Sequence, residues 1–539
     1  MNNGYLCLFL HAHLPFVRHP EAPYYLEENW LFEAITETYI PLLSMLKKLH
    51  RDKVPFRLTM SLTPTLVSML QDELLVQRYS AHLDRLIELS GKEIQRTQSQ
   101  KKLCGLARRY LHLFATTQKT FCITYKKNIV AAFGEYQKKG CLEIVASCAT
   151  HAFLPNSAVH PESVQAQIDV GVDHYIKTFG TQPKGFWLPE CGYYPGVDVF
   201  LQRRGIRYFF LDAHGITSAQ PQPTNNMYAP VRCASGVAAF GRDPLSSKQV
   251  WSADEGYPGD PVYREYYRDI GHELPFEYIR PYIDPCGVRI NTGIKYWRIT
   301  GHTENKELYE PAKARARVKI HAEHFIREKC RQITSLHAQV RRKPILVAPF
   351  DAELFGHWWF EGPLWLEAVI RSSALHSKQL KLISPSDYLK KHPKNQTGAL
   401  SFSSWGFKGY GEFWLNSTND WVYRHIHAAQ EHMLGLKKRY DILKNRRDAP
   451  STIILRAINQ AARELMLLES SDWPFILKAG SMAPYAEMRI KQHTSRFVRL
   501  NNDIINKTID LQWLEEIEKR DSIFADMKCA EYYTGINNG

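Results

Sequence analysis

The sequence predicts an α/β fold built on a parallel β/α barrel, and three observations support this. Short apolar runs rich in β-branched and aromatic residues alternate with stretches of helical periodicity, as in βαβ units. Each run ends in polar or acidic residues, which a barrel gathers at the carboxyl ends of its strands. No run leads into a glycine-rich phosphate loop, which argues against an open nucleotide-binding sheet. The predicted strands are residues 5–10, 56–61, 142–146, 185–188, 208–211 and 344–348.

The chain of 539 residues is too long for one ordinary core. We expect a catalytic barrel over residues 1–395 and a C-terminal helical domain over residues 396–539, where helical spacing dominates. Residues 66–139 exceed a plain connection and predict a helical insertion between the second and third strands. Residues 220–300 are rich in Pro, Gly, Tyr and Asp and predict a long ordered loop over the barrel mouth.

Composition excludes several classes of protein. The 69 basic and 55 acidic residues give a net charge of +14, but no nucleic-acid recognition motif accompanies it, so we expect no nucleic-acid partner. A basic stretch within residues 94–134 predicts a helix with a solvated face. Mean hydropathy is −0.36, and no apolar run is long enough for a membrane span. Ten cysteines without a C-x-x-C pair and the absence of a signal-like N-terminus predict a cytoplasmic protein. Nothing indicates an oligomeric state.

Two segments each place a carboxylate at the end of a predicted strand among aromatic residues. Glu190 lies in GFWLPECGY at residues 185–193, close to Trp187, and Asp351 begins DAELFGHWW at residues 351–359, close to His357 and Trp358. Paired carboxylates flanked by aromatic rings suit glycosidic bond chemistry, in which one acid attacks and the other donates a proton. Either segment alone could be structural, and their coincidence favours the functional interpretation.

His11 and His13 follow the first strand, and His151 follows the third. Three interpretations stay open from the residues alone. The histidines could hydrogen-bond a sugar, they could ligate a metal as in a metal-dependent deacetylase, or they could be purely structural. No H-E-x-x-H element accompanies them, and the density of aromatic residues favours sugar binding.

The C-terminal part opens with WGFKGYGEFWLN at residues 405–416, which is unsuited to a regular helix. We expect this aromatic loop to reach the barrel mouth with Trp405 and Trp414, although a Trp-packed seam between domains is the alternative. SDWPF at residues 471–475 could equally be a plain helix N-cap.

Together these motifs resemble the 1,4-α-glucan branching enzymes of glycoside hydrolase family 57. The resemblance rests on HAHLPF at 11–16, HAFLP at 151–155, WLPECGY at 187–193, FFLDAH at 209–214, FDAELFGHWW at 350–359 and the 405–416 loop, in the family's order. FGRD at 240–243, GYPGD at 256–260, YRE at 263–265 and SDWPF at 471–475 resemble the branching subgroup.

The resemblance implies an incomplete (β/α)7 barrel with a helical insertion and a C-terminal helical domain. It implies a retaining transglycosylase of glycogen synthesis with Glu190 as nucleophile and Asp351 as general acid/base, acting on α-1,4-glucan as donor and acceptor without cofactor or metal. Arg264, Trp405 and Asp472 stand where it places substrate contacts. The remaining candidate contacts are His11, His13, His151, Trp187, Asp212, His357, Trp358 and Trp414.

One position departs from the family pattern: Ser481 stands where the family usually has Gln. A short hydroxyl cannot reach as far as that amide, which puts this substrate contact in doubt. Two rivals within the resemblance are a 4-α-glucanotransferase and an amylase-type hydrolase. A catalytically silent glucan-binding protein is a third, and the intact Glu190 and Asp351 argue against it.

Overall fold

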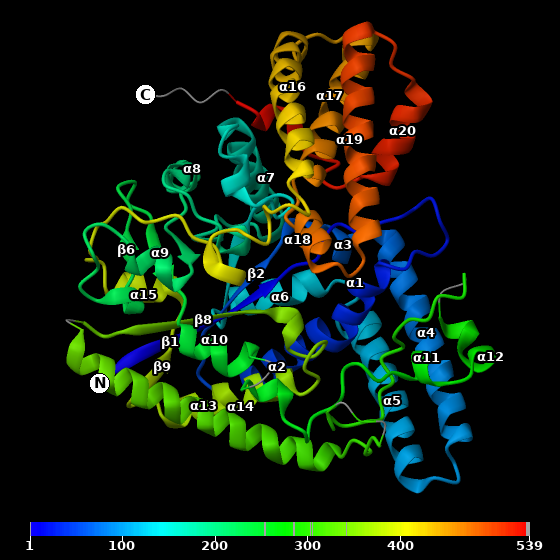
Figure 1. The fold of residues 1–539 in the computed structure, drawn as a ribbon, viewed down its shortest axis with the longest axis vertical. Helices are drawn as coiled ribbons and strands as arrows, with labels where there is room; N and C mark the ends of the chain where they lie inside the picture. The colour runs from blue at the N-terminus through cyan, green and yellow to red at the C-terminus, as the bar shows by residue number, and fades with distance from the viewer. Residues whose placement is uncertain are drawn as a thin grey trace.

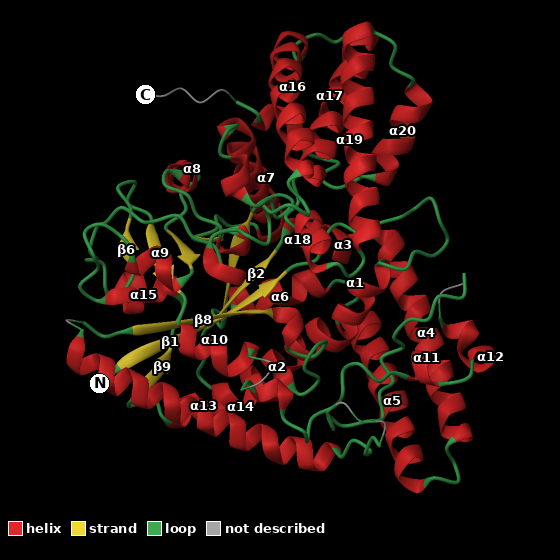
Figure 2. Ribbon diagram, in the orientation of Figure 1, coloured by secondary structure: helices red, strands yellow, loops and turns green. Residues whose placement is uncertain are grey.

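The structure is a computed structural model that describes residues 2–252, 255–283, 286–301, 303, 305–340 and 342–534. A mixed sheet lies within the larger part of the molecule, helices surround it, and a bundle of long C-terminal helices projects from one side (Figures 1 and 2). The predicted C-terminal domain range of 396–539 includes residues 535–539, which lie outside the described residues.

Within the described residues, one nine-stranded sheet follows the order β6-β7-β5-β4-β3-β2-β1-β8, with β9 beside β1. β6 runs antiparallel to β7, and the other pairs are parallel. The strands are β1 Gly4–Ala12, β2 Leu58–Leu62, β3 Leu142–Ser147, β4 Gly185–Trp187, β5 Tyr208–Leu211, β6 Val231–Arg232, β7 Ala238–Gly241, β8 Ile345–Asp351 and β9 Leu380–Leu382.

The sheet curls until its ends meet. A parallel bridge joins Arg242, just after β7, to Val347 of β8, and the Asp243 N–H donates to the Val347 carbonyl at 2.7 Å. All nine residues of β1 are buried, as expected of a parallel strand covered on both faces. The predicted fold class, an incomplete (β/α)7 barrel with added helical parts, is confirmed.

Helices cover the barrel, and the longest, α13, lies beside the lower ends of β1 and β9 in Figure 1. α13 begins with a proline in its first turn, where a missing N–H costs no hydrogen bond. The covering helices are α1 Glu28–Ala34, α2 Ile40–Arg51, α7 Pro161–Phe179, α8 Val197–Arg203, α9 Ala213–Thr217, α13 Pro311–Gln339, α14 Gly362–Leu375 and α15 Pro385–Lys391.

The chain between β2 and β3 is helical: α3 Pro64–Gln71, α4 Glu73–Arg96, α5 Lys101–Lys119 and α6 Ile129–Lys138. α4 starts where the Asp72 carboxylate accepts the Leu75 N–H at 3.0 Å, the usual device of an N-cap. α4 and α5 bury apolar stripes against each other and the barrel. The basic residues Arg108 and Arg109 of α5 are exposed, as a solvated helix face requires.

Residues 220–300 differ from the single long loop expected. They contain β6, β7 and the helices α10 Pro244–Trp251, α11 Ile270–Glu273 and α12 Phe276–Ile279. β7 is only four residues long and two of them are alanine, so its intrinsic strand signal is weak. Pairing with β5 buries all four residues, so tertiary context determines this strand.

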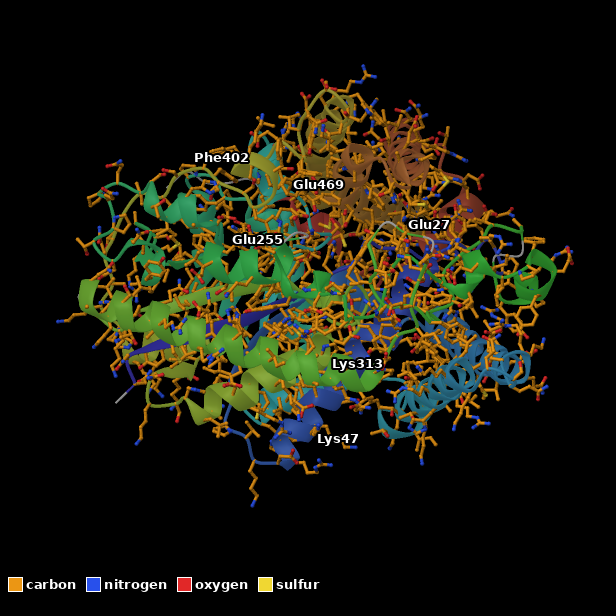
Figure 3. The ribbon with its side chains drawn as sticks, turned by 60° about the horizontal axis from the view of Figure 1, so that its bottom comes forward. Glu27, Lys47, Glu255, Lys313, Phe402 and Glu469 are labelled. Carbon is orange, nitrogen blue, oxygen red and sulfur yellow. The ribbon has the colours of Figure 1, made fainter. Side chains whose placement is uncertain are left out.

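The C-terminal bundle comprises α16 Trp421–Leu443, α17 Ala449–Leu468, α18 Asp472–Ala479, α19 Ala483–Asn506 and α20 Leu511–Arg520. α17 packs against both α16 and α19. Glu469, labelled in Figure 3, lies where the bundle meets the barrel. It accepts hydrogen bonds at 2.7 Å from Gln167 of α7 and Gln430 of α16. No helix among the described residues combines the length and apolar character needed to cross a lipid bilayer.

Candidate active site

Polar side chains from several strands meet at the carboxyl edge of the barrel. The register places Asp351, His11 and Ser61 on one level, because His11 of β1 pairs with Asp351 of β8 on one side and Ser61 of β2 on the other. Glu190 follows β4, and His151 follows β3, the strand next to β4. The fold thus brings the two predicted carboxylates and the histidines to one face.

Both carboxylate oxygens of Glu190 are held by donors from the C-terminal part of the chain. The Trp405 indole N–H donates to Oε2 at 2.6 Å, and the Ser471 hydroxyl donates to Oε1 at 3.1 Å. The Trp405 backbone N–H also donates to the Glu190 carbonyl at 2.8 Å. Such donors favour the ionised form and fix the direction of the carboxylate.

Asp351 differs, because no side-chain hydrogen bond to its carboxyl group is found among the described residues. Burial raises its pKa to about 6, although the charges of His13 and Arg242 oppose that shift. Burial also raises the pKa of Glu190 to about 8, with the Trp405 hydrogen bond opposing the shift and the Asp351 charge adding to it. The two acids therefore repel each other and share about one proton near neutral pH.

Because the pKa of Glu190 is the higher of the two, the shared proton would lie on Glu190 when no substrate is bound. The hydrogen bonds, in contrast, suit an ionised Glu190 and a protonated Asp351. Glu190 is surrounded by donors suited to a carboxylate, while Asp351 lacks such partners and is free to give a proton to a bound oxygen. A bound sugar displaces water from both groups and changes their relative acidity, so the hydrogen bonds outweigh the pKa order of the two acids without substrate.

His11 and His151 are buried and hydrogen-bonded to each other, with their Nε2 atoms 2.9 Å apart. Burial lowers the pKa of both rings, so both are neutral. The second ring nitrogen of each has a hydroxyl partner: Ser61 lies 2.6 Å from Nδ1 of His11, and Ser471 lies 2.8 Å from Nδ1 of His151.

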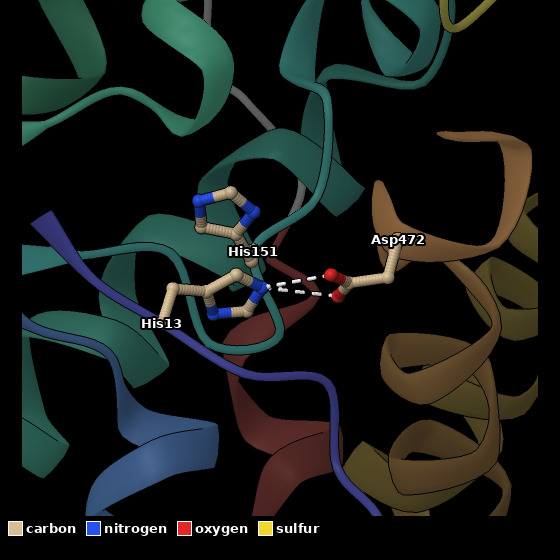
Figure 4. A group of neighbouring side chains, drawn as sticks. All are labelled: His13, His151 and Asp472. Atoms are coloured by element: carbon tan, nitrogen blue, oxygen red, sulfur yellow. Dashed lines mark hydrogen bonds and ion pairs between the residues drawn. The ribbon is translucent and has the colours of Figure 1, made fainter. Parts of the chain in front are cut away.

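His13, His151 and Asp472 form the cluster drawn in Figure 4, whose possible ligand atoms lie within 4.8 Å of one another. Nε2 of His13 is 3.0 and 3.1 Å from the two Asp472 oxygens, and its ring stacks on His151 at 3.7 Å. The spacing would suit a cation. However, both nitrogens of His151 are occupied by His11 and Ser471, so this residue has no nitrogen left for a cation.

Asp212 and Arg242 form a pair next to Trp405. The Arg242 guanidinium donates to Asp212 at 3.2 Å and lies 5.4 Å from the centre of the Trp405 ring. Asp212 also caps α9 by accepting the Ala213 N–H at 2.6 Å. This pair therefore lies beside the Trp405 ring and supports it.

Trp358 and His357 lie at the rim formed after β8. Trp358 is 52% exposed and stacks on Tyr266 with ring centres 4.4 Å apart. The Tyr266 hydroxyl lies 3.3 Å from Nε2 of His357. An exposed, supported indole is the kind of surface on which a sugar ring stacks, because it offers apolar area at low entropic cost.

Two tryptophans predicted as substrate contacts are buried instead. Trp187 is fully buried and stacks beneath His11 at 4.7 Å. Trp414 is 1% exposed and packs on Phe153 at 4.8 Å, with Phe475 nearby. Trp414 therefore belongs to the seam between the domains, which was the alternative for this loop, and Trp187 forms the floor of the site. Sequence spacing cannot separate a stacking platform from the layer beneath it.

Arg264 also differs from its expected place as a substrate contact. Its buried guanidinium donates to Glu37 at 2.9 Å and lies 3.9 Å from the centre of the Phe360 ring. Burial raises the pKa of Glu37, but the charge of Arg264, the hydrogen bond with His357 and the charge of Lys295 together outweigh burial and bring the value down to about 2. An arginine held in this way supports His357, which contacts Glu37 at 3.3 Å, rather than a bound ligand.

Three residues that contribute to the site were not among the predicted ones. Ser471 occupies the N-cap position of α18 but makes no capping hydrogen bond, since its hydroxyl contacts His151 and Glu190. No sequence pattern marks Ser61 as a site residue; it joins the site because the strand register places it beside His11. Glu353 is buried beside Asp351 and accepts from the Tyr39 hydroxyl at 2.5 Å; burial raises its pKa to about 8.

Ser481, the departure from the family pattern, follows Gly480 after the end of α18 and is exposed. No hydrogen bond ties its hydroxyl to the described residues of the site. That Ser481 cannot reach the substrate as the usual glutamine does therefore remains a prediction.

Comparison with known proteins adds family membership to this geometry. The sequence profile described as glycosyl hydrolase family 57 matches residues 7–337, and the profile described as 1,4-alpha-glucan branching enzyme, C-terminal, matches residues 425–532. A 1,4-alpha-glucan branching enzyme of Thermococcus kodakarensis is 33% identical over 98% of this chain and 78% of that protein.

Two solved structures are similar over nearly their whole length. A novel alpha-amylase from Thermotoga maritima has a TM-score of 0.92 and 45% identity, with 100% of each chain covered. A family 57-type branching enzyme from Pyrococcus horikoshii has a TM-score of 0.87 and 33% identity, with 100% of this chain and 98% of that chain covered. The chain belongs to glycosyl hydrolase family 57.

Proposed function

We propose that this protein is a retaining α-glucan branching enzyme. It cleaves an α-1,4-glucan and transfers the released chain to a 6-hydroxyl, which forms an α-1,6 branch. The observation that carries this proposal is the match of residues 425–532 to a branching-enzyme C-terminal domain, because that domain supplies Ser471 and Asp472 to the catalytic face.

The first half-reaction uses Glu190 as nucleophile and Asp351 as general acid. A Glu190 oxygen attacks C1 of the donor sugar while Asp351 gives its proton to the leaving O4, so the α-1,4 bond breaks as a glycosyl ester forms. The donors on Glu190 hold its carboxylate in line for attack. The free carboxyl of Asp351 suits the leaving oxygen.

The second half-reaction returns both acids to their starting states. Asp351, now ionised, takes the proton of an acceptor 6-hydroxyl, whose oxygen attacks C1 and releases Glu190. Water competes for the same position, and then the product is a new reducing end. The ratio of branching to hydrolysis therefore depends on how well the site holds a second glucan and excludes water.

Substrate contacts are proposed for the residues that reach the open face. His13 and Asp472 would hydrogen-bond the sugar next to Glu190, and His11 and His151, whose ring nitrogens are already hydrogen-bonded, would support them from within the barrel. Trp405 would contact the same unit beside the nucleophile, with Asp212 behind it. His357 and the exposed Trp358 would hold a more distant unit of the glucan.

Hydrolysis is the second candidate, and one observation favours it: the alpha-amylase of Thermotoga maritima shares 45% identity with the whole chain. The same two acids serve either outcome, since only the acceptor differs. We infer that branching is the physiological outcome and place it in glycogen synthesis in the cytoplasm, where a branched α-glucan is built.

Proton NMR of amylose incubated with the purified protein tests the proposal, because α-1,4 and α-1,6 anomeric protons are resolved. A growing α-1,6 signal with few new reducing ends supports branching. New reducing ends without that signal would make the protein a hydrolase. Rearranged α-1,4 chain lengths alone would indicate a 4-α-glucanotransferase, and a Glu190→Gln sample supplies the inactive baseline.

A further inference from the structure

A continuous chain of hydrogen bonds leads from the barrel interior to Glu190. Ser61 lies 2.6 Å from Nδ1 of His11, Nε2 of His11 lies 2.9 Å from Nε2 of His151, and Nδ1 of His151 lies 2.8 Å from the Ser471 hydroxyl. That hydroxyl contacts Oε1 of Glu190 at 3.1 Å. All four intermediate residues are at least nine-tenths buried, so bulk water does not compete for these bonds.

The ionisation state of Glu190 determines which atom donates at each link of this chain. An ionised carboxylate can only accept hydrogen bonds. The Ser471 hydroxyl therefore donates its single proton to Glu190 and accepts a hydrogen bond from Nδ1–H of His151. A neutral His151 then has a bare Nε2, which must accept from Nε2–H of His11. A neutral His11 in turn has a bare Nδ1, which accepts the Ser61 hydroxyl proton.

The opposite order fits only a protonated Glu190. Its carboxyl proton would go to Ser471, whose hydroxyl would then donate to Nδ1 of His151. Each further link would reverse, and both imidazoles would exchange tautomers. The two proton orders are therefore coupled to the ionisation of one carboxyl group.

We propose that Ser471, His151, His11 and Ser61 are positioning residues that form one ordered proton relay, which holds Glu190 oriented and ionised for attack. The proposal deepens the proposed function, since it rests on Glu190 as the nucleophile. Ser471 is the decisive link because it alone joins the relay to the carboxylate, and it comes from the C-terminal domain.

The relay acts against strong local repulsion. Asp351 and Asp472 both face Glu190, and their charges disfavour a second charge there. His151 approaches Glu190 at 3.7 Å but is neutral, so it provides a dipole rather than a charge. The donors of Ser471 and Trp405 are thus the groups that favour the ionised nucleophile.

Neutron crystallography of the intact, deuterated protein at pH 9 and pH 5.5 tests the coupling without requiring activity. Where Glu190 carries no deuteron, we expect deuterons on Nδ1 of His151 and Nε2 of His11. Where Glu190 is deuterated, we expect them on Nε2 of His151 and Nδ1 of His11. Tautomers that do not follow the state of Glu190, or an imidazolium at either residue, would overturn the proposal.

Glucan cleavage as a function of pH supplies the second test. Ser471→Ala should move the acidic limb of the kcat profile upward by about one pH unit and lower kcat at least about tenfold, because a hydrogen bond to a charged group is lost. Ser471→Thr, which keeps a hydroxyl, should restore the limb. Ser61→Ala should shift the limb in the same direction by less.

Thr59→Val is the matched control, since it removes a buried hydroxyl two residues before Ser61 whose only described side-chain partner is Cys7. It should leave the limb unchanged, and melting temperatures confirm that each variant folds. An unshifted limb in folded Ser471→Ala would refute the relay. If the native protein cleaves no glucan, the proposed function fails, and the neutron maps still decide the proton order.

Discussion

At the residue scale, strained backbone marks the two loops that carry Glu190 and His151. Glu190 has φ 61° and ψ 21°, and His151 has φ 59°, a left-handed conformation that costs a non-glycine residue about 1–2 kcal/mol. In both loops the C-terminal part of the chain donates to the strained residue's carbonyl, from Trp405 N–H at 2.8 Å and Ser471 N–H at 3.1 Å. The conformation of Glu190, the proposed nucleophile, therefore depends on the C-terminal part of the chain.

Glu190→Gln should abolish transfer and hydrolysis together, by about 10⁴-fold or more, because an amide cannot form the glycosyl ester. The fold should persist, since the amide has nearly the same shape. Turnover of amylose and the melting temperature check both statements. Glu255→Gln, the same change at an exposed glutamate labelled in Figure 3, should retain full activity. Near-normal turnover of Glu190→Gln would remove the nucleophile assignment.

Trp405→Ala should shift products from α-1,6 linkages toward new reducing ends, because loss of the ring admits water to the glycosyl ester. Trp405→Phe keeps an aromatic ring but loses the N–H bonded to Glu190. It should therefore react more slowly with an unchanged product ratio. Parallel counts of reducing ends and α-1,6 signals measure that ratio. An identical ratio in Trp405→Ala would show that this ring does not shield the intermediate.

At the element scale, the sequence predicted the long buried strands and missed the short one that completes the barrel. β1 and β8 are continuous apolar runs followed by reactive residues, so periodicity and position both identify them. β7, by contrast, is four residues, AAFG, and becomes a strand only by pairing with β5. Its neighbour Arg242 then closes the barrel, which no local pattern indicates.

The same reasoning explains which site residues were predictable. Glu190, Asp351 and His11 lie at or just after the carboxyl ends of recognisable strands, so their meeting at one edge follows from the fold class. Ser471 is 281 residues from Glu190 in the chain, and its neighbouring motif resembles an ordinary helix start. Trp358 and Trp414 have similar aromatic surroundings in sequence, yet one is exposed and the other buried. Contacts between segments far apart in the sequence determine whether such a residue reaches the site and whether its side chain is exposed.

The turn after β8 depends on glycine at position 356. Its φ is +119°, and a Cβ there would lie 1.7 Å from the Glu37 carbonyl oxygen. Gly356→Ala should therefore destabilise the protein by several kcal/mol, at least about 3 kcal/mol, and distort the segment that presents His357. Thermal or denaturant unfolding measures the loss.

Gly435→Ala is the matched control for this substitution. Gly435 lies within α16, and a Cβ there meets open space. Alanine should stabilise the helix slightly, by about 0.5–1 kcal/mol. Equal effects of the two substitutions would show that the close approach to Glu37 does not constrain the turn.

At the scale of the whole molecule, one catalytic face is assembled from two parts of the chain. The barrel supplies Glu190, Asp351 and the histidines, and the C-terminal part supplies Trp405, Ser471 and Asp472. The seam between them is packed with aromatic rings around Trp414 but also buries the charge of Glu469. Stability of this seam and competence of the site are therefore linked.

Glu469→Gln tests how this seam contributes to stability as a function of pH. Burial raises the pKa of Glu469 to about 7, although hydrogen bonds from Gln430 and Gln167 oppose the shift. The folded state thus binds a proton more tightly than the unfolded state. The free energy of unfolding should fall as pH rises from about 4.5 to 7 and then level off, with a contribution of about 2–3 kcal/mol from this group.

The amide variant removes this dependence. The buried Oε1 of Gln430 has no partner among the described residues and can accept the new amide N–H after the side chain rotates. Glu469→Gln should therefore be more stable than the native protein at pH 8 and no more stable at pH 4.5. Glu431→Gln, on the exposed face of α16, should follow the native curve. Melting curves of the two glutamine variants that stay parallel across this range would show that Glu469 does not carry a buried charge at the seam.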